Sequence, residues 1–129
     1  MAFKSVKVLI ATIGLNLGSA AIAEDLVYFG TKNTGTVFYY DADTIRRNSN
    51  NTVEVWTKLD QSKDKTVSAR TQRAKLRIDC SAETYGATSL YLYRSDGSVI
   101  ESFDFEYPEM WSIPPVGHIK NLFKILCPR

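Results

Sequence analysis

The stretch Ala74-Lys75-Leu76-Arg77-Ile78-Asp79-Cys80 decides how this chain folds. Apolar and charged residues alternate along it, which predicts a β-strand with one buried face. The strand ends in Cys80, one of the two cysteines of the chain, and the other is Cys127, third from the C-terminus. We therefore expect the C-terminal segment to be fastened to this strand.

The first 23 residues predict a cleaved secretory signal peptide. Lys4 and Lys7 form its positive start, residues 8–15 form its apolar run, and Ala21-Ile22-Ala23 has the small residues of a cleavage site. A membrane anchor is the alternative, but a spanning helix needs about 20 mostly apolar residues, and this run is shorter. We expect cleavage after Ala23. Because the residue at the cleavage site is Glu24 and not cysteine, we expect no lipid anchor, and we expect no stable membrane insertion after cleavage.

Removing the signal peptide leaves residues 24–129, a length typical of one small domain. The chain has 16 basic and 14 acidic residues, and Lys4 and Lys7 leave with the signal peptide. The predicted mature chain is thus neutral, with 14 of each sign. A nucleic-acid-binding protein needs a net basic surface to neutralise phosphates, so we expect no nucleic-acid partner.

An even number of cysteines in an exported protein predicts a disulfide, here Cys80–Cys127. The loop-entropy model gives about 4 kcal/mol of stabilisation for a loop of this length, as an upper value. Two free thiols or a metal pair are the alternatives. A structural zinc site needs four ligands, and two cysteines with the one histidine, His118, do not supply them. We expect no metal and no cofactor.

The pattern along the chain predicts an α+β fold: an antiparallel sheet of about six strands with a C-terminal helix packed on it and tethered by the disulfide. Pro115 suits the first turn of the helix, which we place at 115–126. Its apolar stripe also fits a membrane surface, but packing on the sheet is favoured. The expected strands are 26–30, 36–41, 52–59, 74–80, 84–93 and 99–106.

Two features are candidates for partner binding. Trp56 falls on the charged face of its strand, where it is either covered core or an exposed binding aromatic, and we favour core. The polar stretch 60–73 is the longest expected loop, and it holds a local basic cluster; a solvated connection without function is the favoured interpretation. The residues of this cluster are Lys63, Lys65, Arg70 and Arg73.

Motifs for catalysis are missing from the sequence, so we predict that the protein is not an enzyme. No Walker loop, G-x-G-x-x-G, H-E-x-x-H or G-x-S-x-G motif is present. Cysteines joined in a disulfide cannot act as nucleophiles, because the thiolate is the reactive form. His118 is expected on the polar side of the helix.

The ordered set of motifs resembles the surface-adhesin protein E family of Gram-negative bacteria, over nearly all of residues 24–129. The motifs are Tyr39-Tyr40-Asp41, Thr44-Ile45-Arg46, Val53-x-Val55-Trp56-x-Lys58, Ile78-Asp79-Cys80, Tyr91-x-Tyr93, Asp96-Gly97, Trp111-Ser112-Ile113-Pro114 and Cys127.

This resemblance implies a six-stranded sheet with a disulfide-tethered helix, attachment to host extracellular-matrix or plasma proteins, and homodimers in some members. The chain lacks the lipidation cysteine of the adhesin that names the family, so a periplasmic location competes with the cell surface. The second hypothesis is a soluble periplasmic protein that binds a small ligand or an envelope protein. A hydrolase is the third and least favoured hypothesis.

Overall fold

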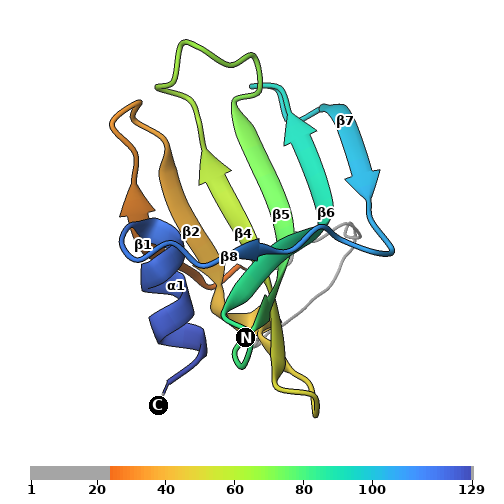
Figure 1. The fold of residues 1–129 in the computed structure, drawn as a ribbon. Helices are drawn as coiled ribbons and strands as arrows, with labels where there is room; N and C mark the ends of the chain where they lie inside the picture. Colours follow the sequence, from red (N-terminus) through yellow and green to blue (C-terminus); the bar gives the residue numbers. More distant parts are fainter. Residues whose placement is uncertain (1–23, 129) are drawn as a thin grey trace, which may run out of the picture.

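A computed structural model describes residues 24–128, so the predicted signal peptide lies outside the described residues. The strands form one antiparallel sheet, and a 3-10 turn, η1 (Ala42–Thr44), follows the second strand (Figure 1). The strands are β1 (Leu26–Thr31), β2 (Val37–Asp41), β3 (Arg46–Arg47), β4 (Thr52–Asp60), β5 (Thr71–Asp79), β6 (Thr84–Tyr93), β7 (Val99–Asp104) and β8 (Trp111–Ser112). The main path runs β1-β2-β4-β5-β6-β7, while β3 pairs with β4 and β8 with β6.

Strand β5 lies inside the sheet and pairs along its whole length with β4 and β6. The predicted strand at 74–80 is therefore confirmed, although it begins earlier, at Thr71, and ends at Asp79, one residue before Cys80. Its apolar side chains Leu76 and Ile78 are buried, while Lys75 and Arg77 are half-buried on the opposite face. This alternation orients the sheet, because a directly paired residue on a neighbouring strand points to the same side.

The core lies between the sheet and the helix α1 (His118–Leu126). Leu122, Phe123 and Leu126 from the helix are buried against apolar side chains of the strands. Each fully buried leucine contributes about 1.5–3 kcal/mol relative to an exposed one. The strand residues of the core are Phe29, Phe38, Tyr40, Val53, Val55, Ala74, Leu76 and Ile78.

Four contacts hold α1 in place from end to end. The His118 ring stacks on Phe38 with centroids 3.9 Å apart, and the Asn121 side chain donates to the Phe29 carbonyl at 3.3 Å. At the other end, Arg47 donates to the Leu126 carbonyl at 2.7 Å, and the predicted disulfide joins Cys127 to Cys80 with Cα atoms 5.6 Å apart. The disulfide prediction is thus confirmed.

Two predictions about the helix were wrong. It begins at His118, three residues after the predicted start, because Gly117 precedes it with a positive φ of 104°. His118 was expected on the polar side but packs inward. A Cβ at Gly30 would lie 2.5 Å from the His118 Cβ, so the close approach depends on the glycine. Within residues 24–128, no helix combines the length and the apolar character needed to cross a membrane.

The fold is more β-rich than the predicted α+β class, since residues 24–128 form eight strands and one α-helix. Six strands make the main path, as predicted, and the two additional strands have two residues each. β8 belongs to the return segment (residues 105–117), which crosses from β7 to α1 (Figure 1). This segment packs tightly on Gly86, where a Cβ would lie 2.5 Å from the Glu109 carbonyl oxygen. The close backbone approach requires glycine at this position.

Replacing Cys127 with serine should lower the melting temperature by about 10–20 °C, because the 47-residue link then no longer restricts the unfolded chain. Thermal unfolding followed by circular dichroism, under oxidising conditions, measures the shift. Reduced wild-type protein is the control and should melt with the variant. Equal melting of the variant and the oxidised wild type would show that the disulfide is unimportant for stability.

Acidification from pH 7.5 to 5.5 should destabilise the protein through His118. Burial lowers the pKa of this imidazole below its ordinary 6.5, and the nearby Lys32 ammonium lowers it further. The unfolded chain therefore binds a proton more readily, and stability is lost as the pH falls through about 6.5. Urea unfolding at both pH values measures this loss. His118→Gln should reduce it, since the chain has no other histidine; an unchanged loss would refute the assignment.

Candidate functional site

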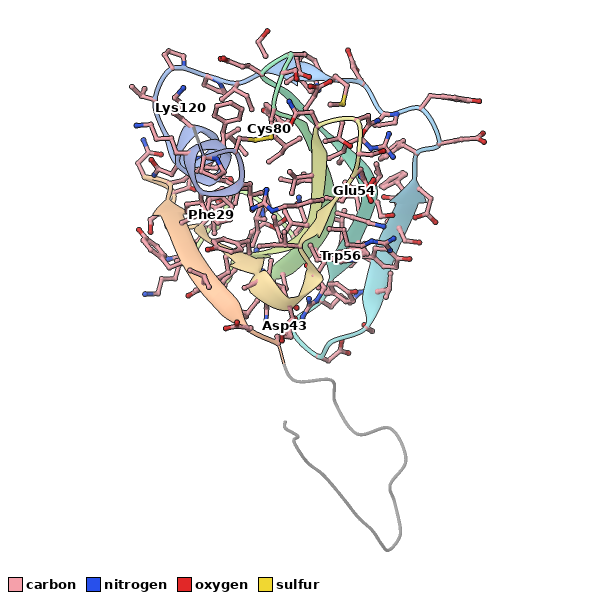
Figure 2. The ribbon with its side chains drawn as sticks, turned by 90° about the horizontal axis from the view of Figure 1, so that it is seen from below. Phe29, Asp43, Glu54, Trp56, Cys80 and Lys120 are labelled. Carbon is pink, nitrogen blue, oxygen red and sulfur yellow. A yellow bond between two sulfur atoms is a disulfide. The ribbon has the colours of Figure 1, made fainter. Side chains whose placement is uncertain are left out.

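The face of the sheet opposite α1 carries a row of aromatic and basic side chains. Direct pairing across five strands aligns them on one side of the sheet. Figure 2 shows the two faces: Phe29 lies beside α1, whereas Glu54 and Trp56 lie on the other side of the strands. The aligned residues are Tyr28, Tyr39, Lys58, Arg73 and Tyr91, in the order of the strands.

A groove of about 480 Å³ is hollowed into this face. Trp56 and Tyr91 form its aromatic part, with ring centroids 6.1 Å apart, and Tyr93 stacks on Tyr91 at 6.4 Å. All three side chains are half-buried, so their ring surfaces are held in place and still reach solvent. We call this the aromatic groove. Its lining residues are Glu24, Asp41, Thr44, Trp56, Arg73, Tyr91 and Tyr93.

Opposite charges meet at the rim of the aromatic groove. The Arg73 guanidinium forms an ion pair with Glu24, and Lys58 lies 4.0 Å from the same carboxylate. Further along β4, Glu54 accepts from Arg77 at 3.0 Å and lies 3.8 Å from Lys75. Such half-exposed pairs contribute little to stability, typically 0–1 kcal/mol. They are therefore available to exchange partners with a charged ligand.

The groove is also tied to the backbone around η1. Asp41 is buried and accepts from the backbone amides of Asp25 and Asp43, both at 3.2 Å. Thr44 accepts from the Trp56 amide at 2.9 Å, which fixes η1 over the first half of β4. These contacts keep the aromatic walls in a defined geometry without burying them. Preformed aromatic surfaces of this kind favour binding because little ordering is needed.

The structure corrects the preferred core position of Trp56. Its side chain is half-buried on the face that α1 does not cover, and it is not part of the buried cluster. The pattern placed Trp56 on the charged face correctly, but within the described residues η1 reaches only its edge and leaves the ring partly exposed. The structure instead fits the alternative prediction, in which the Trp56 ring is accessible to a partner.

The predicted basic cluster does not form one surface. Lys63 and Lys65 are exposed on the loop at 61–70, whereas Arg73 lies in β5 at the aromatic groove. Arg70 folds inward and donates to the carbonyls of Ser62 at 3.3 Å and of Asp64, as well as of Val67. Arg70 therefore serves the loop's own structure. The remaining three cations stay candidates for partner binding.

A buried carboxylate anchors the same loop. Asp64 accepts from the Thr66 hydroxyl at 2.6 Å and from its amide at 2.9 Å, and Thr36 reaches the other oxygen at 3.5 Å. The hydrogen bond from the Thr66 hydroxyl is the main cause that lowers the pKa of Asp64 below its ordinary value. The loop between β4 and β5 is thus internally braced.

A larger depression, of about 740 Å³, lies where α1 ends at the disulfide. Its lining mixes polar side chains with Val53, Leu126 and the disulfide, and it has no aromatic residue to provide an anchor. The aromatic groove is the better candidate site, since binding sites combine apolar ring surface with a few convergent polar groups.

The aromatic groove has the means to bind but no recognisable catalytic set. His118 lies on the opposite face, in the contact between α1 and the sheet. Both cysteines are joined in the disulfide, and within the described residues no group of acidic, histidine and cysteine side chains is arranged to hold a metal ion. The aromatic rings of the groove can stack on a partner. The Arg73 guanidinium and the carboxylates can form ion pairs and hydrogen bonds with it.

The fold and the groove define a class: a mostly β protein with one disulfide-tethered helix and an open aromatic surface. The family model described as surface-adhesin protein E matches residues 26–128. The chain belongs to the surface-adhesin protein E family, and membership classes it as an adhesin-like, exported surface protein. None of the curated protein sequences is significantly similar to it.

Solved structures share the fold. Protein E from non-typeable Haemophilus influenzae aligns with a TM-score of 0.60 and 16% identity, over 88% of this chain and 82% of that one. Crystal form II of Haemophilus influenzae protein E aligns with a TM-score of 0.56 and 14% identity, over 90% of this chain and 96% of that one. At such identities the likeness establishes the fold.

Sequence reasoning missed most of the groove. Tyr91 and Tyr93 are two residues apart, and a strand with period 2 places both on one face. That signal was present in the sequence. Placing Tyr91 and Tyr93 beside Trp56 also requires knowing how β5 pairs with β4 on one side and with β6 on the other. Glu24 and Thr44 come from outside the long strands, and no local pattern connects them to the groove.

Proposed function

We propose that this chain is an exported, non-enzymatic binding protein that attaches to host extracellular-matrix or plasma proteins. Family membership supports the adhesin-like part of this proposal. The observation that carries it is the aromatic groove, in which Trp56 and Tyr91 stand beside the Arg73 ion pair. Tryptophan, tyrosine and arginine are the side chains that most often dominate the energy of protein interfaces.

The charges around the groove suit a protein partner with mixed charge. Arg73 and Lys58 share one carboxylate, Glu24, so an acidic side chain of the partner can replace it. Lys63 and Lys65 are exposed on the neighbouring loop and add positive charge that attracts an acidic surface over a longer range. The rings then provide the apolar contact once the surfaces meet.

A second candidate is a soluble periplasmic protein that binds a small ligand or another envelope protein. Two observations favour it. The groove volume of about 480 Å³ falls in the usual range for small-molecule sites, roughly 300–1,000 Å³. In addition, the residue directly after the predicted cleavage site at Ala23 is Glu24 and not the cysteine that would carry a lipid anchor.

Tyr91→Ala should weaken binding to an immobilised basement-membrane matrix at least about tenfold, because an aromatic anchor at an interface commonly contributes 2 kcal/mol or more. Surface plasmon resonance with the purified protein, residues 24–129, measures the loss. Tyr28→Ala is the matched control, since Tyr28 lies in the same row, is 57% exposed and is outside the groove. Equal binding by the two variants would reject the groove as the attachment site.

Localisation separates the two candidate functions. If the protein is an adhesin, protease added to intact cells should degrade it, while a known periplasmic protein in the same cells stays intact. If the full amount is instead released by osmotic shock and survives the protease, the adhesin proposal fails and the periplasmic one stands. Mass spectrometry of the N-terminus in the same samples checks cleavage after Ala23.

A further inference from the structure

Strand β7 forms an open edge of the sheet. Among the described residues it pairs with β6 on one side only, and Figure 1 shows it at the right-hand end of the sheet with no further strand beside it. The Phe105 amide donates to the Thr88 carbonyl of β6 at 2.9 Å. Because backbone groups alternate along an antiparallel strand, the amides and carbonyls of Ser102 and Asp104 face outward.

This edge lacks the lysine and proline that often protect edge strands from pairing with another chain. Proteins normally place lysine, proline or a covering segment on an exposed edge to prevent pairing with another chain. Residues 99–107 contain no lysine and no proline. They also expose aromatic rings: Phe103 and Phe105 are 37% and 41% exposed and stack at 6.1 Å, and Tyr107 is 88% exposed.

Negative charge is concentrated at the same edge. Residues 95–119 contain five acidic residues and no lysine or arginine, although residues 24–129 as a whole have equal numbers of each sign. Glu101, Glu106 and Glu109 are exposed and form no ion pair within the described residues. Asp104 is also exposed, and it accepts one hydrogen bond from Ser89 at 2.8 Å.

We propose that the β7 edge binds a basic, extended protein segment, which adds to the sheet as a further antiparallel or parallel strand. The outward backbone groups of Ser102 and Asp104 would supply the hydrogen bonds, as in other cases of strand addition. The carboxylates select lysine- or arginine-rich segments, and the exposed rings of Phe103 and Phe105 contact the stems of those side chains.

Charge decides between this partner and a second copy of the chain. Pairing β7 with the β7 of another copy would bring the carboxylates of both edges to one seam, and like charges across a strand pair are destabilising. A basic segment instead neutralises them. The inference goes beyond the proposed function, since it uses the sheet edge and does not require the aromatic groove to bind anything.

The test uses a nine-residue peptide that alternates lysine with valine or threonine, with both ends blocked. Isothermal titration of the protein, residues 24–129, should show saturable binding that weakens when salt is raised from 50 to 500 mM. Ser102→Pro should weaken binding at least about tenfold, because it removes one outward amide while the bonds to β6 remain. Ser102→Ala is the matched control; it keeps the amide and should bind as the wild type does.

Two further arms keep the test decisive if Ser102→Pro fails to fold. The same peptide with N-methyl groups on alternate amides should lose binding to the wild-type protein, since it keeps its charge but cannot pair along its edge. Glu101→Gln with Glu106→Gln should weaken binding, whereas Asp43→Asn, an exposed carboxylate on η1, should not.

Three outcomes would overturn the inference. Undiminished binding of the N-methylated peptide would mean that charge alone attracts it. Equal affinity of the proline and alanine variants, both folded, would exclude the outward amide of Ser102. A dimer in sedimentation velocity that the proline variant abolishes, together with no peptide binding, would assign the edge to a second copy of the chain.

Discussion

The covalent link between Cys80 and Cys127 is the constraint on which the rest of the structure depends. It joins the end of the interior strand β5 to the end of α1, so the two halves of the core cannot separate. A helix of nine residues has little stability alone, because isolated helices shorter than about 12–15 residues are marginal in water. The disulfide and the Arg47 contact at the same end hold it against the sheet.

Because α1 covers one face of the sheet, the other face is left to solvent within the part of the chain that the structure describes. Alternation along β4 and β5 then places ionic and aromatic side chains there, and these pair with one another where they can. The ring of Trp56 packs against Tyr91, and its backbone amide donates to Thr44 of η1. These contacts fix the position of Trp56 while part of its ring stays accessible to solvent. The aromatic groove is thus a direct result of where the helix packs.

Much of the fold could be predicted from the sequence. Residues that alternate with period 2 define which face of each strand is buried, and two cysteines allow only one intramolecular disulfide. The strand at 74–80, its central place and the disulfide were predictable from such local signals. The burial of Trp56 was not, since it depends on whether a distant segment covers that face. The inward packing of His118 likewise depends on Gly30, 88 positions away, which lets the helix approach β1.

The net charge of residues 24–129 is near zero, but the charged residues are distributed unevenly along this part of the chain. With five acidic residues in 95–119, the remainder of residues 24–129 holds 14 basic and nine acidic ones. On the groove face, Glu24 and Glu54 form ion pairs with four of these cations, so the rings lie beside exchangeable ion pairs and a surplus of positive charge. At the β7 edge no cation neutralises the carboxylates within the described residues. The two surfaces therefore differ in charge, although Tyr91 of the groove is paired directly with Ser102 of the β7 edge.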